Sequence, residues 1–124
     1  MNPLRILIIE DEPAIAANLA ALLVAKGHTA VTCLEGAQGV TRARMETFDL
    51  LLLDVMLPHM SGFDVCKLLR SDPKTAKMKI VMVTGLGRMG DVEEAFRAGA
   101  DDYLIKPFDS IRLLKKIDKV LAAP

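Results

Sequence analysis

The chain has 124 residues, of which 52% are hydrophobic and 26% charged, and it is long enough to bury the core of one domain. Its 16 Lys and Arg residues balance 16 Asp and Glu residues, so the zero net charge gives no electrostatic basis for binding nucleic acid or an anionic membrane. No apolar run approaches the roughly 18 residues that a membrane span requires, and the N-terminus does not resemble a signal peptide.

Five short apolar segments are predicted strands. They span residues 4–9, 29–34, 49–53, 79–83 and 102–105. Several are apolar on both faces, as expected for strands that helices cover on both sides. Cys33 and Cys66 lack metal-ligand spacing and are expected to pack as small apolar side chains. This cysteine usage favours a cytoplasmic protein.

Helical patterns of period 3.6 separate these strands. The first begins near Pro13, ends at Gly27, and carries an apolar face formed by Ile15, Leu19, Leu22 and Leu23. A second helix is expected over residues 37–47, with Val40 and Ala43 directed inward.

The last three predicted helices have recognisable starts. The third opens at Ser61, and the fourth opens at Asp91 and stops at Gly99. The fifth follows Asp109, with an apolar stripe formed by Ile111, Leu114, Ile117 and Leu121. Strict alternation of five strands and five helices predicts a single-domain α/β fold, (βα)5, with a doubly wound parallel five-stranded sheet and helices on both faces.

The predicted strands end in polar groups. The first runs into Glu10 and Asp11, the third into Asp54, the fourth into Thr84 and the fifth into Lys106. Ligands of doubly wound sheets bind outside the carboxyl ends of the strands. If the first and third strands are central neighbours, the three carboxylates meet at one edge of the sheet.

Three converging carboxylates cannot all remain ionised without a nearby cation. Hard oxygen ligands in small number favour Mg²⁺, which keeps several waters and leaves room for a phosphate oxygen. The Asp54 carboxylate could attack phosphorus to give an aspartyl phosphate. Lys106 and the Thr84 hydroxyl would then contact other phosphoryl oxygens.

Four stretches carry a specific resemblance: IIEDEP, LLLDVMLPHMSG, VMVTG and GADDYLIKPF. With them the chain resembles the receiver domain of two-component response regulators over essentially its whole length. The resemblance implies that residues 1–124 form one receiver domain without an output domain. It also implies the strand order 2-1-3-4-5 of chemotaxis receivers.

The same resemblance assigns roles at the predicted edge of the sheet. Asp54 would be the phosphoacceptor, and Asp11 and Asp54 would bind Mg²⁺ (or Mn²⁺) directly. The backbone carbonyl of Met56 would be a further ligand, and Glu10 would act mainly through water.

Three further positions complete the site that the resemblance implies. Thr84 would be the switch hydroxyl, Tyr103 the switch aromatic and Lys106 the phosphoryl-binding lysine. The peptide between Lys106 and Pro107 would usually be cis.

The implied function is that of a phosphorylation-activated signalling switch. A histidine kinase or histidine phosphotransferase would phosphorylate Asp54, Thr84 would move inward, and Tyr103 would turn into the vacated space. The change would bias the face formed by the fourth helix, the fifth strand and the fifth helix toward binding a downstream protein or an output domain. A homodimer through this face is a further possibility. The residues assigned to it are Glu94, Asp101, Asp102, Arg112 and Lys116.

The resemblance predicts a signalling domain and not an enzyme, although the domain would assist its own phosphoryl transfer and slow dephosphorylation. Met56 and Leu86 occupy positions that tune hydrolysis in this family, and neither side chain can orient a water. Two alternatives remain open. The fold could act as an interaction module without phosphorylation, or GLGRMG at residues 85–90 could bind a nucleotide through its G-x-G-x-x-G spacing.

Overall fold

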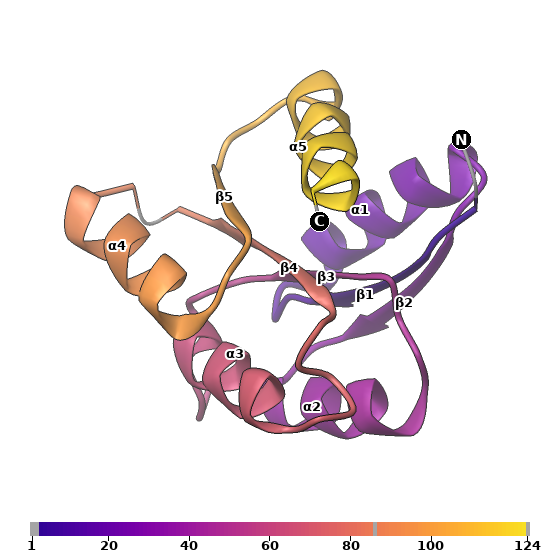
Figure 1. Ribbon diagram of the computed structural model, residues 1–124. Helices are drawn as coiled ribbons and strands as arrows, with labels where there is room; N and C mark the ends of the chain where they lie inside the picture. The colour runs from indigo at the N-terminus through magenta and orange to yellow at the C-terminus, as the bar shows by residue number, and fades with distance from the viewer. Residues whose placement is uncertain (1–2, 86, 124) are drawn as a thin grey trace.

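The computed structural model describes residues 3–85 and 87–123. Leu86, to which the sequence assigned a part in hydrolysis, lies outside the described residues. Strands and helices alternate along the whole chain (Figure 1). In order they are β1 (Arg5–Ile9), α1 (Pro13–Ala25), β2 (Thr29–Cys33), α2 (Gly36–Met45), β3 (Leu50–Leu53), α3 (Gly62–Ser71), β4 (Lys79–Thr84), α4 (Met89–Ala98), β5 (Asp102–Ile105) and α5 (Ser110–Ala122).

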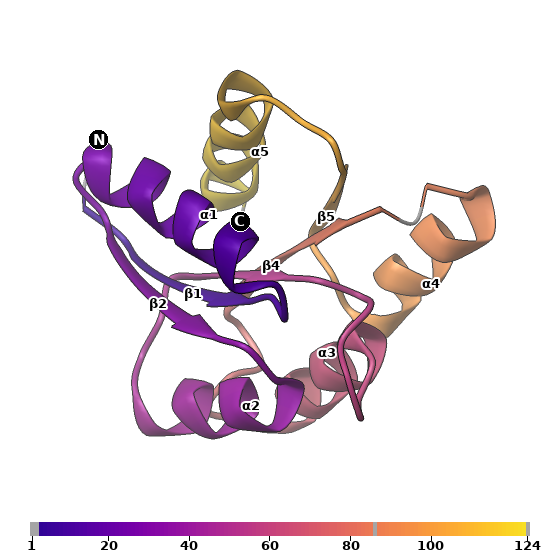
Figure 2. The same cartoon turned by 180° about the vertical axis from the view of Figure 1, so that it is seen from behind.

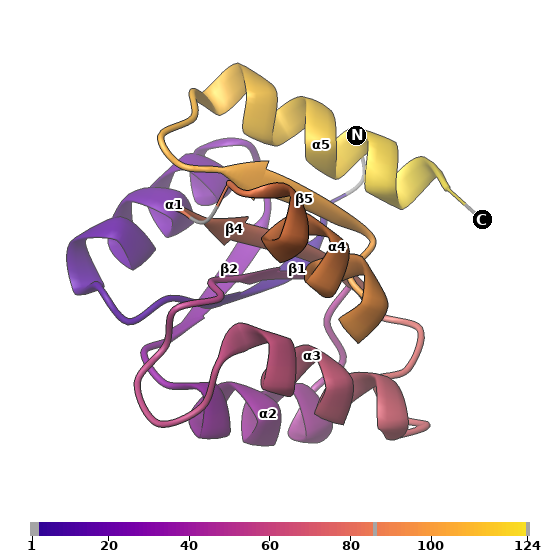
Figure 3. The ribbon, with the colours of Figure 1, turned by 90° about the vertical axis from the view of Figure 1, so that its left-hand side faces the viewer.

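The five strands form one parallel sheet in the order β2-β1-β3-β4-β5, which confirms the predicted fold class and order. Helices α1 and α5 cover one face of the sheet, and α2, α3 and α4 cover the other (Figures 2 and 3). From β1 the chain first adds β2 on one side, and it then adds β3, β4 and β5 on the other side, so the switch in strand order lies between β1 and β3. This is where doubly wound sheets carry their sites.

Two apolar layers hold the helices to the sheet. Alternate residues of each strand point to opposite faces, so Ile8 and Leu52 pack toward α1 and α5 while Ile9 and Leu53 pack toward α2 and α3. All four side chains are essentially inaccessible to solvent. The strands β1 and β3 therefore sit in the middle of the molecule and hold their carboxyl ends rigidly.

Most predicted element boundaries agree with the structure to within one or two residues, and two helix starts are confirmed by capping contacts. The Ser61 hydroxyl accepts a hydrogen bond from the Asp64 N–H at 3.2 Å, and the Asp109 carboxylate accepts one from the Arg112 N–H at 2.8 Å. Cys33 and Cys66 are buried and unpaired, and burial raises the pKa of the Cys66 thiol to about 11.

Two predictions about the C-terminal half were wrong. Helix α4 begins at Met89 and not at Asp91, because the Arg88 carbonyl already accepts hydrogen bonds from the Asp91 and Val92 N–H groups. Ile111 does not belong to the inward stripe of α5 and is 64% exposed. Ile117 is buried in that stripe as predicted, Leu113 and Val120 are buried beside it, and Leu114 and Leu121 pack against the same core while partly buried.

Of the helices within the described residues, none is both long and apolar enough to cross a membrane.

Two adjacent aspartates hold the strand β5 in place. The Asp101 carboxylate accepts hydrogen bonds from the Arg70 guanidinium and the Ile80 N–H, both at 2.8 Å. The buried Asp102 carboxylate accepts from the Lys116 ammonium at 3.0 Å and from the Tyr103 N–H at 2.8 Å. Both side chains, which the sequence assigned to an interaction face, are thus engaged within the chain.

Replacement of Asp102 by Asn should destabilise the protein at neutral pH. Burial alone raises the pKa of the Asp102 carboxyl, but the hydrogen bonds from Lys116 and the Tyr103 N–H outweigh it and hold that pKa below its ordinary value. Stability from this carboxylate is therefore present above its unfolded-state pKa near 4 and is lost as pH falls through the lower folded-state pKa. We expect Asp102→Asn to lower the free energy of unfolding by about 1–3 kcal/mol at pH 7.

Urea unfolding followed by circular dichroism, at pH 7 and again near pH 3, would measure this difference and its expected decrease in acid. The exposed Asp118 lies on α5, and Asp118→Asn is the matched control, which should change stability by less than about 0.5 kcal/mol. An Asp102→Asn protein as stable as the control at pH 7 would contradict the assignment.

Candidate functional site

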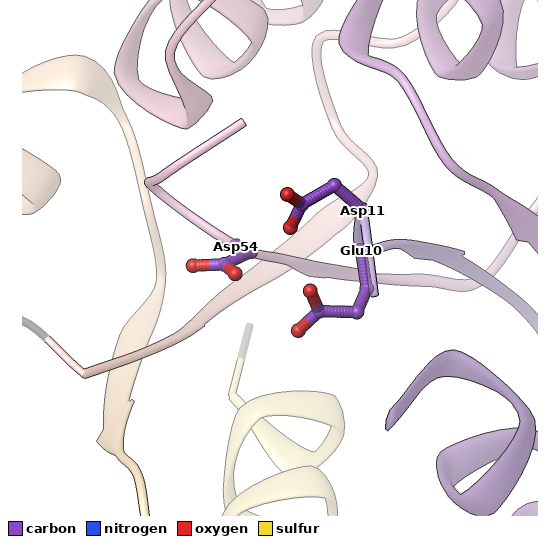
Figure 4. Close-up of side chains that lie close together, drawn as sticks. All are labelled: Glu10, Asp11 and Asp54. Atoms are coloured by element: carbon purple, nitrogen blue, oxygen red, sulfur yellow. The ribbon is translucent and has the colours of Figure 1, made fainter. Parts of the chain in front are cut away.

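Three carboxylates meet at the carboxyl edge of the sheet, as the sequence predicted. Glu10 and Asp11 follow β1 and Asp54 follows β3, and the Asp54 N–H donates to the Ile9 carbonyl at 3.0 Å. Each side chain offers an oxygen within 4.8 Å of those of the other two, and their carboxylates converge (Figure 4). We call these three residues the acidic cluster. Glu10 and Asp54 are buried, whereas Asp11 is accessible to solvent.

Lys106 supplies a positive charge to the acidic cluster from the end of β5. Its backbone N–H donates to the Thr84 carbonyl at 2.8 Å, which extends the pairing of β4 and β5. Its ammonium donates to Glu10 Oε1 and lies 3.2 Å from Asp54 Oδ2. The following peptide, to Pro107, is cis, as the resemblance implied.

The charges in this site shift one another's ionisation. Burial raises the pKa of Glu10, and the negative charge of Asp54 adds to the effect, while the Lys106 ammonium and the Glu12 N–H oppose it. Burial lowers the pKa of Lys106, but the hydrogen bond to Glu10 and the charge of Asp54 outweigh this and raise it above its ordinary value. Lys106 is therefore a persistent cation.

The acidic cluster fits a small divalent cation. Its donors are hard carboxylate oxygens, and the solvent-accessible Asp11 leaves a path for hydrated ions. The Lys106 ammonium contacts Glu10 and Asp54 but is a single positive charge beside three carboxyl groups, so it compensates the charge of the cluster only in part. Met56 lies beside it, with its N–H donating to Asp54 Oδ1 at 3.2 Å.

Thr84 is the last residue of β4 and Tyr103 lies within β5, and both side chains are inside the structure. Thr84 is fully buried and Tyr103 is 6% exposed. Burial raises the pKa of the Tyr103 phenol to about 12, with further contributions from the charges of Asp91 and Asp54. The aromatic ring is thus already directed inward here.

The residues assigned to an interaction face have different surroundings. Glu94 on α4 and Arg112 on α5 are exposed. Asp101 binds Arg70, and Asp102 binds Lys116 within the chain. The structure therefore does not leave all five side chains equally available to a partner.

Sequence reasoning missed the part that Gly62 plays in the site. Its N–H donates to the Val55 carbonyl at 2.8 Å, and an added Cβ would lie 2.2 Å from the Asp54 carbonyl oxygen. The first turn of α3 thus packs directly on the backbone of Asp54, which only glycine permits. The signal was present in the Ser-Gly pair that ends the stretch LLLDVMLPHMSG.

The glycine-rich stretch at residues 85–90, of which Leu86 lies outside the described residues, follows β4 and not the first strand of the sheet. Helix α4 begins inside it, at Met89, and the strand that follows is β5, at the edge of the sheet. In the dinucleotide-binding fold this motif instead follows the first strand of the sheet.

Comparison with known proteins identifies relatives over most of the chain. The sequence model of the response regulator receiver domain matches residues 6–118. Protein PilH of Pseudomonas aeruginosa is 38% identical over 118 residues, which cover 95% of this chain and 98% of PilH. The DNA-binding dual master transcriptional regulator RpaA of Synechocystis is 41% identical over 117 residues, which cover 94% of this chain and 48% of RpaA. This chain thus spans about half the length of RpaA.

Solved structures share the fold. The receiver domain of sensor histidine kinase PA1611 from Pseudomonas aeruginosa superposes with a TM-score of 0.90 at 27% identity. The match covers 98% of this chain and 100% of the other, and that structure has a magnesium ion coordinated in its active-site cleft.

Substitution of Gly62 by Ala should displace the backbone of Asp54 and Val55. The added methyl would meet backbone atoms that cannot rotate away, so we expect a loss of about 1–3 kcal/mol in the free energy of unfolding. Gly90→Ala in α4 is the control, because a Cβ there meets nothing within 4 Å and the helix should gain up to about 1 kcal/mol. Denaturant titration of both variants measures the change in the free energy of unfolding. A Gly62→Ala protein as stable as Gly90→Ala would show that the contact with Asp54 is not tight.

Proposed function

Because this chain belongs to the response regulator receiver domain family, we propose that it switches between signalling states when Asp54 accepts a phosphoryl group from a histidine kinase or histidine phosphotransferase. The observation that supports this most directly is the position of the Asp54 carboxylate, which is buried at the end of β3, 3.2 Å from the ammonium of Lys106 and beside the other two carboxylates of the acidic cluster. The domain acts as a signalling component and not as a classical enzyme.

In the proposed transfer, an oxygen of Asp54 forms a bond to phosphorus as the bond between phosphorus and the donor's imidazole nitrogen breaks. The electron pair of the broken bond stays with the imidazole, and the product is an aspartyl phosphate. Lys106 lies 3.2 Å from Asp54 Oδ2 and can neutralise an oxygen of the arriving group. The hydroxyl of Thr84, at the neighbouring strand end, would donate to another oxygen.

Asp11 and Asp54, with the Met56 carbonyl and with Glu10 through water, would hold Mg²⁺ or Mn²⁺. When bound, the ion offsets the negative charge of both the carboxylates and the phosphoryl group. The magnesium ion in the PA1611 receiver domain supports this proposal. Met56, 63% exposed beside Asp54, has no group that can orient a water, so we expect slow hydrolysis of the aspartyl phosphate.

Phosphorylation would change the output face through Thr84 and Tyr103. Movement of Thr84 toward the phosphoryl group would make the inward position of Tyr103 more favourable, and β5 would transmit this to α4 and α5. The phosphoryl group can shift this equilibrium only by the difference between its contacts in the two states. Tyr103 is 6% exposed in this structure, so its ring already occupies the inward position that phosphorylation would favour.

The signal would pass by protein contact through the face formed by α4, β5 and α5. A downstream protein, a linked output domain or a second copy of the chain could use this face, with Glu94 and Arg112 as its exposed charges. We propose that residues 1–124 work as one receiver unit in the cytoplasm, without themselves contacting nucleic acid or a membrane.

Incubation with acetyl phosphate and Mg²⁺ tests the phosphoacceptor directly. Intact-mass spectrometry should show one phosphoryl group on the wild type and none on Asp54→Asn, because the variant lacks the nucleophilic oxygen. Asp118→Asn, on the exposed side of α5, is the control and should be modified like the wild type.

Chelation of the metal before the reaction should abolish the modification. A folded wild type that gains no phosphoryl group would instead support an interaction module that works without phosphorylation. Modification of Asp54→Asn to the same extent would place the acceptor elsewhere.

A further inference from the structure

Arg70, near the C-terminal end of α3, joins three segments at the amino edge of the sheet, opposite the acidic cluster. Its Nε donates a hydrogen bond to the Gly99 carbonyl at 2.8 Å, and its Nη2 donates to the Asp101 carboxylate at 2.8 Å. Its Nη1 donates to the carbonyls of Ala76 and Met78, in the segment that leads into β4. One guanidinium thus connects α3 with the end of α4, with the start of β5 and with the approach to β4.

The contact between Arg70 and the end of α4 is close. Gly99 ends that helix with a φ of 110°, in the left-handed region that favours glycine. A Cβ added at Gly99 would lie 2.7 Å from Arg70 Cγ. The stem of Arg70 therefore packs against the backbone at the end of α4 while its guanidinium binds the carbonyl of the same residue. The side chain is 20% exposed, so water competes weakly for these hydrogen bonds.

The two ends of α4 are held unequally. The buried residues of the helix, Ala95 and Ala98, both lie in its C-terminal half, whereas residues 89–94 are exposed or partly buried. Gly85 and Gly90 have open space where a Cβ would stand. The N-terminal end of α4 stands away from the sheet, and its C-terminal end lies beside α3 (Figures 1 and 2). Movement of α4 should therefore cost less at its N-terminal end.

From this arrangement we infer that Arg70 is a positioning residue for the proposed switch: it fixes the C-terminal end of α4 and the start of β5 to α3, so that α4 turns about this end when Asp54 is modified. The inference rests on the proposed function. Strand β4 connects the two edges of the sheet, because it begins at Lys79, beside the Arg70 contacts, and ends at Thr84. A displacement beside Thr84 is then largest at the Met89 end of α4, and the fixed end gives the movement one direction.

The forked shape of the guanidinium is needed for this role. Its donors reach acceptors on three segments, and Asp101 orients it, since the same carboxylate oxygen also accepts from the Ile80 N–H at 2.8 Å. The ammonium of a lysine is a single point charge and cannot reach all of these acceptors at once. Asp101, assigned by the sequence to an interaction face, therefore supports the switch from within the chain.

Amide nuclear magnetic resonance with beryllofluoride and Mg²⁺ tests where α4 moves. In the wild type, chemical-shift changes should be large over residues 89–94 and clearly smaller over residues 96–101. In Arg70→Met, which removes the donors and keeps an apolar stem, the changes should extend over residues 96–101. Lys67→Met, at an exposed position of the same helix, is the control and should keep the wild-type pattern. Wild-type changes of equal size in both segments would overturn the inference.

Hydrogen exchange of the metal-free protein tests the contact without phosphorylation. The N–H groups of Gly99 and Ala100 donate to the carbonyls of Phe96 and Ala95, both at 3.0 Å. Arg70→Met should speed their exchange by about tenfold or more relative to the amides of β1. Arg70→Lys, which keeps the charge and serves alone if Arg70→Met does not fold, should restore only part of the protection.

The outcomes separate this inference from the proposed function. Full protection in Arg70→Lys, or exchange that rises equally in β1 and at Gly99, would overturn the role of Arg70. If α4 responds to beryllofluoride with the same pattern in Arg70→Met as in the wild type, only that role is wrong. If no amide of α4 responds in the wild type, the proposed switch fails and the inference fails with it.

Discussion

Repulsion among the three carboxylates of the acidic cluster is the constraint on which the site depends. Oxygens from Glu10, Asp11 and Asp54 lie within 4.8 Å of one another, two of the three side chains are buried, and little solvent screens them. Such a cluster needs positive charge. Lys106 supplies one unit of it, and a divalent cation can supply the rest; an arriving phosphoryl group, itself negative, increases the need for that cation.

The fold maintains this unfavourable arrangement through rigid apolar strands. Ile9 pairs with Leu53 across β1 and β3, and both side chains are fully buried, so the residues that follow them cannot separate. Gly62 fixes the opposite side, where α3 rests on the Asp54 carbonyl. The stability of the hydrophobic layers thus offsets the electrostatic cost of the site. Because these strands are rigidly packed, a change of charge at Asp54 can alter the positions of residues in β4 and β5.

Much of this could be predicted because it follows from local pattern. Apolar runs of strand length that end in charged residues indicated both the sheet and the edge where Asp54 and Lys106 meet. The start of α4 could not be predicted, because backbone hydrogen bonds to the Arg88 carbonyl form the first turn without a capping side chain. The partners of Glu10 and Asp102 were also hidden, since they depend on contacts between residues 96 and 14 positions apart.

Nuclear magnetic resonance of the amide groups, with and without the phosphoryl mimic beryllofluoride and Mg²⁺, tests whether Asp54 controls the face formed by α4, β5 and α5. If it does, chemical-shift changes begin beside Asp54, continue through Thr84 and Tyr103 into α4 and α5, and are absent in Asp54→Asn. Changes confined to the loops around Asp54, with β5 and α5 unaffected, would contradict a switch and leave only a cation-binding site.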